Sequence, residues 1–283
     1  MDGPPRRMAA ATACWEVEQK FVLDDATAIL KRLQDVGLRE HGRRHMVDSY
    51  FDVAADDYPL IRQDCWLRYR CYSNEGVAAT TTSSSDSRAT GQWELKRGNR
   101  ESARSNNADR SEGASRATVY QELEGLEALQ ATQELLLGGS PPYPISGSST
   151  TQATATKGLL ARDLYEIPPP PVAIPGLHTF ARIVTHRSSW SLPRDDDGDV
   201  AGAVVVVDLD TTDFGYAVGE VERLVTKASD IEAARRDLQT WLETVLGKDA
   251  LAGPPPVGKL EYYLQTQQPH VYNILVEEGL VAS

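Results

Sequence analysis

Six short segments of this chain alternate charged side chains with apolar ones. They are residues 15–21 (WEVEQKF), 66–70 (WLRYR), 93–96 (WELK), 119–123 (VYQEL), 204–210 (VVVVDLD) and 218–224 (VGEVERL). Because successive side chains of a β-strand point to opposite faces, each segment would carry its charges on one face and apolar side chains on the other. One such strand could have a solvated outer face, but six strands with both signs of charge indicate a face that binds a charged ligand.

Length and composition limit the classes of protein to which the chain can belong. With 283 residues, 41% of them hydrophobic, it can bury a sizeable core as one large domain. A formal net charge of −12 leaves no basic surplus for coating a nucleic acid, and no apolar run approaches the ~18 residues of a membrane span. The three cysteines (Cys14, Cys65 and Cys71) fit packing positions in a reducing compartment. We therefore expect a cytoplasmic protein with neither a nucleic-acid nor a membrane partner.

Low-complexity stretches interrupt the strand-like segments. Residues near 73–91, 98–117 and 138–176 are rich in Ser, Thr, Gly, Pro and other small polar residues. Such stretches cannot bury enough apolar surface to fold alone, and the first two fall between strand-like segments. We therefore predict a single domain over residues 1–283, with a core at about 14–280 and these stretches as loop insertions.

Helical patterns separate the groups of strands. They are expected at about 25–36, 126–137 and 229–247, and then from residue 259 and from residue 269. The third helix is predicted to begin with a capping box formed by Ser229 and Glu232. This order favours an α+β protein, and closing its antiparallel strands into a β-barrel with surrounding helices would remove exposed strand edges. Because a closed barrel leaves no edge strand to pair, we expect a monomer.

The charged faces combine two kinds of group. Ammonium and guanidinium groups match phosphate oxygens, and here they are Lys20, Arg68, Arg70, Lys96 and Arg187. The acids would repel a polyphosphate unless they hold divalent cations, and acids without His or Cys select hard ions such as Mg²⁺ or Mn²⁺. These acids are Glu16, Glu18, Glu122, Asp208, Asp210, Glu220 and Glu222. A metal–polyphosphate complex would satisfy both sets.

Each pattern also has a simpler interpretation. A single pair of alternating acids is more often a solvated strand face, at roughly nine to one. A barrel with structural ion pairs would show the same alternation. Trp66 is in phase with two arginines, but Trp usually packs in a core. The chain has no G-x-x-x-x-G-K-[ST], G-x-S-x-G or C-x-x-C motif, which argues against the common nucleotide-loop, serine-hydrolase and redox routes.

Taken together, the motifs resemble those of a known family. In chain order they are E-x-E-x-K at 16–20, L-R-x-R at 67–70, W-E-L-K at 93–96, Tyr-x-Glu at 120–122, D-L-D at 208–210 and E-x-E at 220–222. This order is similar to that of the triphosphate tunnel metalloenzymes, also called the CYTH superfamily. Residues 185–192, 207–225 and 258–265 further resemble its thiamine triphosphatase branch. The resemblance covers most of the chain outside the insertions.

The resemblance implies an enzyme that uses Mg²⁺ to hydrolyse thiamine triphosphate to thiamine diphosphate and phosphate. It implies that Trp66 stacks on the cationic thiazolium of thiamine, and that Lys20 pairs with Tyr50 to activate the attacking water. The implied triphosphate contacts are Lys20, Arg68, Arg70, Lys96, Arg187 and Lys259. The implied metal ligands are Glu16, Glu18, Asp210, Glu220 and Glu222, with Asp208 and Glu122 as nearby acids.

Some features depart from the family pattern and leave alternatives open. A low-complexity loop of about twenty residues replaces a tight turn between L-R-x-R and W-E-L-K, and Phe51 and His186 stand where Tyr and Lys are expected. An inorganic triphosphatase on the same fold would need only the triphosphate contacts. A non-catalytic polyphosphate-binding module would keep the charged face without the chemistry. An adenylyl cyclase relative would need a nucleobase pocket, which the sequence does not locate.

Overall fold

The structure is a computed structural model that describes residues 14–53, 57–73, 90–98, 117–138, 167–193, 205–248, 251 and 253–281. Its strands are β1 (Cys14–Val22), β2 (Arg39–Asp52), β3 (Cys65–Ser73), β4 (Thr90–Gly98), β5 (Thr118–Glu124), β6 (His178–Ser191), β7 (Val206–Thr212) and β8 (Ala217–Val225). Its α-helices are α1 (Ala26–Asp35), α3 (Gly125–Leu136), α4 (Ile231–Val245), α5 (Lys259–Gln267) and α6 (Pro269–Glu277). Short 3₁₀ helices lie at Ile61–Gln63 and Ala228–Asp230.

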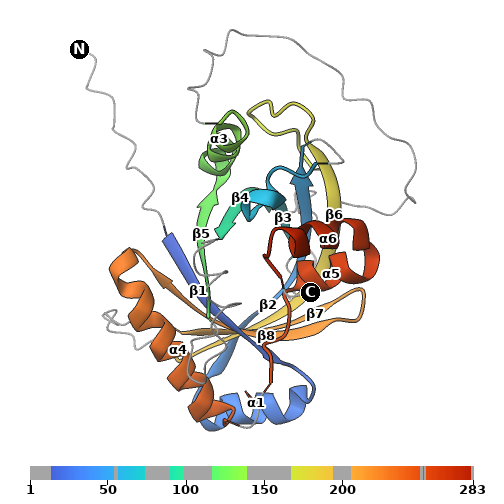
Figure 1. Cartoon of the computed structure of the whole chain (residues 1–283). Coiled ribbons are helices and arrows are strands. Elements are labelled where there is room, and N and C mark those ends of the chain that lie inside the picture. The colour runs from blue at the N-terminus through green and yellow to red at the C-terminus, as the bar shows by residue number, and fades with distance from the viewer. Residues whose placement is uncertain are drawn as a thin grey trace, which may run out of the picture.

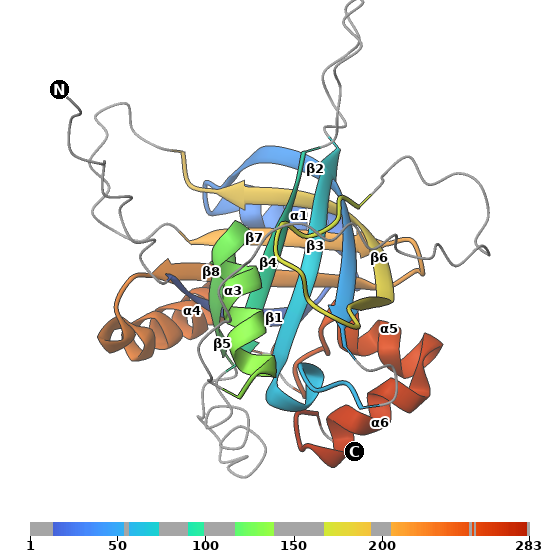
Figure 2. The same ribbon diagram turned by 90° about the horizontal axis from the view of Figure 1, so that it is seen from above.

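The strands close into one barrel in the order β1-β5-β4-β3-β2-β6-β7-β8 (Figures 1 and 2). Every neighbouring pair is antiparallel, and the pairing of β8 with β1 completes the ring. The predicted α+β fold with a closed antiparallel barrel is therefore confirmed. The alternating charges of all six segments fall in strands, whereas β2 and β6, which have 14 residues each, lack that signal.

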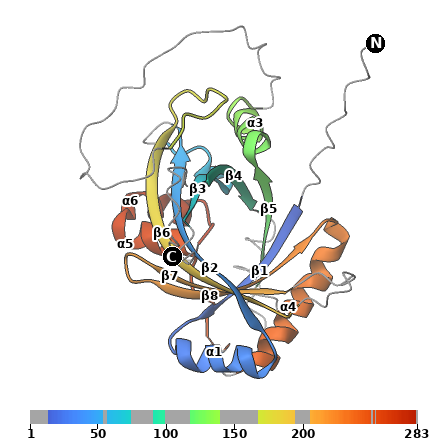
Figure 3. The same cartoon turned by 180° about the vertical axis from the view of Figure 1, so that it is seen from behind.

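Helices α1 and α4 lie side by side on one side of the barrel (Figures 1 and 3). Leu33 of α1 and Leu238 of α4 are fully buried against Val17 and Val221, which stand on the outward faces of β1 and β8. Full burial of a Leu side chain stabilises a fold by about 1.5–3 kcal/mol. The apolar faces of the alternating strands therefore turn outward here, as expected, and the charges turn inward.

Helix α3 packs over β4 and β5, at the far end of the molecule from α1 and α4 (Figure 3). Its Leu129 is fully buried in a cluster with Leu67 of β3 and Leu95 of β4. The loop at 168–176 joins the same cluster through Val172 and Ile174. This stretch is a loop, as predicted, but it is docked on the core. Most residues of the other predicted insertions, at 73–91, 98–117 and 138–167, lie outside the described residues. The assignment of the whole chain to a single domain stays a prediction.

Helices α5 and α6 depart from the expectation that every apolar strand face turns outward. Tyr50 is opposite Ala181 in the β2–β6 register, and both belong to a cluster with Leu264 of α5 and Leu275 of α6. Because Tyr50 lines the barrel cavity, Ala181 lies on the same inward face. The two helices therefore cover an apolar part of the inward face, next to its charged part.

The first residues of α1 and α4 show how well local sequence signals predict where a helix begins. The Asp25 carboxylate accepts a hydrogen bond from the Ala28 N–H at 2.9 Å, and so caps α1. The predicted capping box of Ser229 and Glu232 was wrong. Ser229 lies in a 3₁₀ turn, its hydroxyl donates a hydrogen bond to the Asp230 carboxylate at 3.0 Å, and α4 begins only afterwards.

No helix in the described part of the chain is long and apolar enough to cross a membrane.

Candidate active site in the barrel

The barrel encloses a cavity of about 380 Å³ that contains most of the predicted site residues. The start of α5 and every strand except β7 contribute to its lining. The predicted residues that line it are Glu16, Glu18, Lys20, Tyr50, Trp66, Arg68, Arg70, Lys96, Glu122, Arg187, Glu220, Glu222 and Lys259. The remaining two, Asp208 and Asp210, stand on β7 and contact the cavity-lining Arg187. The alternation therefore predicted which side chains meet in space.

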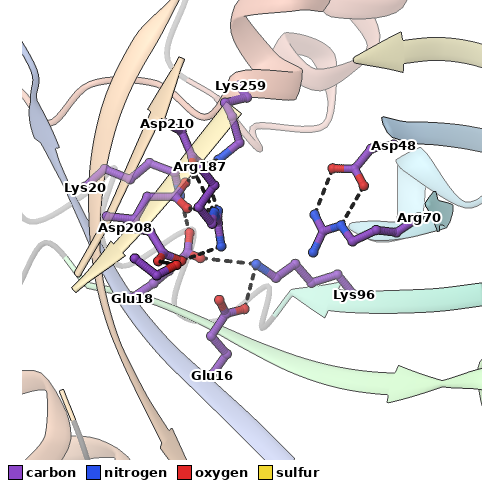
Figure 4. Close-up of polar contacts among 12 residues, drawn as sticks. Glu16, Glu18, Lys20, Asp48, Arg70, Lys96, Arg187, Asp208, Asp210 and Lys259 are labelled. Atoms are coloured by element: carbon purple, nitrogen blue, oxygen red, sulfur yellow. Dashed lines mark hydrogen bonds and ion pairs between the residues drawn. The ribbon is translucent and has the colours of Figure 1, made fainter. Parts of the chain in front are cut away.

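Each of the two inward guanidiniums of β3 has a carboxylate partner on a neighbouring strand. The Arg70 guanidinium donates two parallel hydrogen bonds to the Asp48 carboxylate, from Nε to Oδ1 at 2.6 Å and from Nη2 to Oδ2 at 2.8 Å (Figure 4). The Nη2 atom of Arg68 lies 2.6 Å from the Oε2 atom of Glu94. Burial would raise the pKa of Glu94, but Arg68 and Arg70 outweigh it and hold this pKa at about 2. We call Asp48, Arg68, Arg70 and Glu94 the paired wall, because its charges compensate one another.

The side of the barrel formed by β1, β7 and β8 is richer in acids, some of which line the cavity and some of which lie just behind its lining. We call the following set the acidic wall: Glu16, Glu18, Asp208, Asp210, Glu220 and Glu222. The Nζ atom of Lys96 lies 2.6 Å from Oε2 of Glu16 and 3.1 Å from Oε2 of Glu18. Lys20 pairs with Glu18 on its own strand, and Figure 4 shows both lysines directed at these acids. Two ammonium groups, those of Lys20 and Lys96, thus form ion pairs with the β1 acids of this wall.

Arg187 and Lys259 reach the acidic wall from β6 and α5. Arg187 pairs with Asp208, and its Nη2 lies 2.7 Å from Oδ2 of Asp210 and 3.0 Å from Oε2 of Glu220. Lys259 pairs with Asp210 as well, and its Nζ lies 3.1 Å from Oε1 of Glu220. Because Lys259 is the first residue of α5, these contacts tie the C-terminal helix pair to the cavity.

The acids of the acidic wall fall into two electrostatic groups. Burial would raise the pKa of Glu18, Asp210 and Glu220, but the neighbouring lysines, with Arg187 at Asp210, lower it. The second group comprises Glu16, Asp208 and Glu222. Here burial and the neighbouring acids outweigh the nearby cations, so the pKa of each acid is raised.

In this second group the pKa of Glu16 lies well above its ordinary value, and that of Asp208 is also raised. Burial, followed by the charge of Asp208, raises the pKa of Glu222 to about 7. At Glu16 and Asp208, burial and the neighbouring acids thus outweigh the cations that lie beside them, Lys96 and Arg187.

Tyr50 and Trp66 face the cavity from β2 and β3. The indole N–H of Trp66 donates to Oδ1 of Asp64 at 3.1 Å, which orients the ring. The expected pairing of Lys20 with Tyr50 is not among the contacts of the described residues. Tyr50 packs near Phe180, with ring centroids 6.3 Å apart, while Lys20 pairs with Glu18. Strands β1 and β2 lie on opposite sides of the barrel, which separates the two side chains.

Sequence reasoning assigned no role to several residues at the cavity. Arg44, Tyr72, Glu94 and Tyr120 line it, and Asp48 pairs with the cavity-lining Arg70. The period-two rule already placed Glu94 on the charged face with Lys96, and it could have added Tyr72 and Tyr120, which alternate with predicted residues on their strands. Arg44 and Asp48 stand on β2, which has no alternating pattern.

Within the described ranges, no group of three or more His, Cys, Asp or Glu side chains is arranged to hold a metal ion. The assignment of metal ligands therefore stays a prediction.

Comparison with known proteins adds independent information. The chain is 30% identical over 266 residues to the thiamine-triphosphatases of Macaca fascicularis and Homo sapiens, which covers 93% of this chain and 89% of each relative. No protein-family model matches. Solved structures that align include a Pyrococcus horikoshii protein, PH1819, at 15% identity and a TM-score of 0.45, over 89% of this chain and 99% of that one. A putative adenylyl cyclase from Hippeastrum, described with a dominant triphosphatase activity, aligns at 15% identity and a TM-score of 0.42, over 89% and 95%.

Proposed function

The chain belongs to the thiamine-triphosphatase family, and on that premise we propose that it hydrolyses thiamine triphosphate to thiamine diphosphate and inorganic phosphate. The observation that carries the proposal is the content of the cavity. One cavity of about 380 Å³ brings together six ammonium and guanidinium groups from the predicted set, several acids and Trp66. This combination suits a ligand with a polyphosphate at one end and a cationic aromatic ring at the other.

The cavity cations would bind the triphosphate oxygens. Arg68 and Arg70 offer planar forks that match phosphate geometry, while Lys96 faces the cavity from the adjacent strand β4 and Arg187 from β6. Burial would lower the pKa of Lys20, but Glu18 and Glu220 raise it above its ordinary value. The Lys20 ammonium therefore keeps its proton and acts as a hydrogen-bond donor, not as a base.

The oxygen-only donor set of the acidic wall fits a hard divalent cation such as Mg²⁺ or Mn²⁺. We assign the metal contacts to Glu16, Glu18, Asp210, Glu220 and Glu222, with Asp208 and Glu122 as nearby acids. Burial and the charge of Asp208 raise the pKa of Glu222 to about 7, and no Lys or Arg of the described residues lies within salt-bridge distance of it. Glu18, Asp210 and Glu220, already compensated by Lys and Arg, would bind the cation as Lys20 and Lys259 turn to the phosphates. A bound Mg²⁺ would neutralise charge on the phosphoryl oxygens.

Hydrolysis would proceed by in-line attack of water on the terminal phosphorus. The P–O bond to the thiamine diphosphate leaving group breaks, and the water oxygen becomes part of the released phosphate. Phosphoryl transfer of this kind passes through a loose transition state, so positioning and charge stabilisation supply most of the rate. We assign the positioning of the water to Lys20 and Tyr50, which face the cavity from opposite sides of the barrel.

Phosphate release from thiamine triphosphate, inorganic triphosphate and ATP, each with and without Mg²⁺, tests this proposal. We expect thiamine triphosphate with Mg²⁺ to be hydrolysed fastest, because only this substrate offers a cationic ring to Trp66. Equal turnover of the first two substrates would replace the thiamine assignment with an inorganic triphosphatase. Absence of turnover with all three would favour a polyphosphate-binding module.

We also propose that the protein acts as a monomer in the cytoplasm. The closed barrel supports the first point, because it offers no edge strand to a second copy. Light scattering during gel filtration tests the monomer, and fractionation of cells with an antibody against the chain tests the location.

A further inference from the structure

Arg44 is a cavity residue that the proposed reaction does not use. It stands on β2 directly opposite Arg187 of β6, and it lines the same cavity as Arg68 and Arg70. Its guanidinium carbon lies 5.9 Å from the centroid of the Tyr72 ring. Tyr72 in turn shares a side-chain hydrogen bond with Arg70. The Arg44 side chain is therefore connected to the phosphate-binding arginines through one aromatic ring.

The charge environment of Arg44 differs from that of the other cavity cations. Each of the six predicted cations has at least one carboxylate within salt-bridge distance. Within the part of the chain that the structure describes, Arg44 has no such partner, and its opposite neighbour on β6 is another arginine. A guanidinium directed at a cavity beside a second guanidinium creates a local site for an anion.

The position of Tyr72, the aromatic neighbour of Arg44, along β3 indicates which anion this site would bind. The inward side chains of this strand are, in order, Trp66, Arg68, Arg70 and Tyr72. At about 3.3 Å per residue, the six steps from Trp66 to Tyr72 span about 20 Å. Trp66 and the Arg44–Tyr72 pair thus stand at opposite ends of β3, with the two phosphate-binding arginines between them.

We propose that Arg44 and Tyr72 form an additional anion subsite that takes the distal phosphate of a linear polyphosphate longer than a triphosphate. The inference rests on the proposed use of Arg68 and Arg70 as polyphosphate contacts. A phosphate beyond the third would meet the uncompensated Arg44 guanidinium and the Tyr72 hydroxyl. The chain should therefore bind a tetraphosphate more tightly than a triphosphate.

Calorimetric titration of the full chain with inorganic tripolyphosphate and inorganic tetraphosphate tests the proposal. EDTA in the buffer prevents metal-dependent turnover, so the result does not depend on the proposed activity. We expect tetraphosphate to bind about fivefold more tightly, the size of effect expected for a charge pair that stays accessible to water. The Arg44→Ala variant should lose this preference, whereas Arg44→Lys should keep part of it.

Arg43→Ala is the matched control. Arg43 precedes Arg44 on the same strand, points to the opposite face and pairs with Glu40 at 2.6 Å, so its loss should leave the preference unchanged. Melting temperatures of the variants verify that each is folded. Equal affinity of the wild-type chain for the two polyphosphates would overturn the proposal. A preference for tetraphosphate that persists in Arg44→Ala would do so as well.

Discussion

The paired wall and the acidic wall face the same cavity but use charge differently. In the paired wall, two guanidiniums meet two carboxylates, and Glu94 is held firmly ionised. In the acidic wall, Lys20, Lys96, Arg187 and Lys259 meet a larger number of acids, and some of these acids have raised pKa values. Figure 4 shows the separation, with Asp48 and Arg70 apart from the cluster around Arg187.

The difference indicates a division of roles within one tunnel. A phosphate that enters the paired wall finds forks already oriented by Asp48 and Glu94, whose carboxylates hold Arg70 and Arg68 in place. A divalent cation that enters the acidic wall finds oxygens that the protein's own cations do not fully compensate. Substitutions in each wall test this division of roles.

The largest effect is expected for Arg187→Met. This change leaves Asp208, Asp210 and Glu220 without their guanidinium, and unpairing a buried charge network costs about 3–5 kcal/mol of unfolding free energy. It also removes a phosphate contact, so kcat/KM should fall about 10³-fold. Urea unfolding and phosphate release measure the two effects. Arg223→Met is the control, since Arg223 pairs with the exposed Asp237 outside the barrel, and it should cost under about 1 kcal/mol. Equal losses in the two variants would contradict the role given to the acidic wall.

The second change compares one acid from each wall. Added Mg²⁺ should stabilise the wild-type chain by about 2.7 kcal/mol at a concentration near 100 Kd, seen as a rise in melting temperature. Glu222→Gln should abolish this rise, because it removes an uncompensated acid. Glu94→Gln should lower the melting temperature by unpairing Arg68 but keep the response to Mg²⁺. If both variants respond to Mg²⁺ like the wild type, the metal does not bind where we assign it.

The third change removes the aromatic ring beside the paired wall. Trp66→Ala should raise KM for thiamine triphosphate about tenfold, the effect of losing one cation–π contact. The KM for inorganic triphosphate should stay unchanged, because that substrate has no ring to stack. Steady-state kinetics with both substrates make the comparison. A Trp66→Ala protein with the wild-type preference would refute the stacking assignment and leave Trp66 as a packing residue.

The smallest effect is expected for Glu122→Gln, at the junction of the two walls. The Oε1 atom of Glu122 lies 3.7 Å from both Arg68 and Lys96, and its side chain is 30% exposed. Contacts that are this long and this accessible to water are weak, so kcat/KM should change by less than about fivefold. A larger loss, measured under the same conditions as for Glu222→Gln, would place Glu122 among the principal metal ligands.

Much of the candidate site was predictable because the relevant signal is local. Glu16, Glu18 and Lys20 share a face simply because they stand two residues apart on one strand. The same rule placed Arg68 with Arg70 and Glu220 with Glu222, and all of these line the cavity. Asp48 and Arg44 were missed because β2 carries charges on both faces near its start, which hides the period.

The packing of α5 and α6 was also beyond sequence reasoning. Their apolar residues predict helices, but not that these helices cover an inward face of the barrel beside Tyr50. The docked loop at Val172 and Ile174 is a similar case, since its composition indicates only a loop. In each case the partner surface is formed by residues far away in the chain.

The sequence by itself determined the chemistry of the tunnel, because strand periodicity is a local property of the backbone and assigns each side chain to a face. Only the tertiary structure decided which charge meets which. Asp48 meets Arg70, and Lys259 meets Asp210, because barrel closure and strand register bring together residues that lie 22 and 49 positions apart. The balance between burial and neighbouring charge, and with it the contrast between the two walls, depends on those distances.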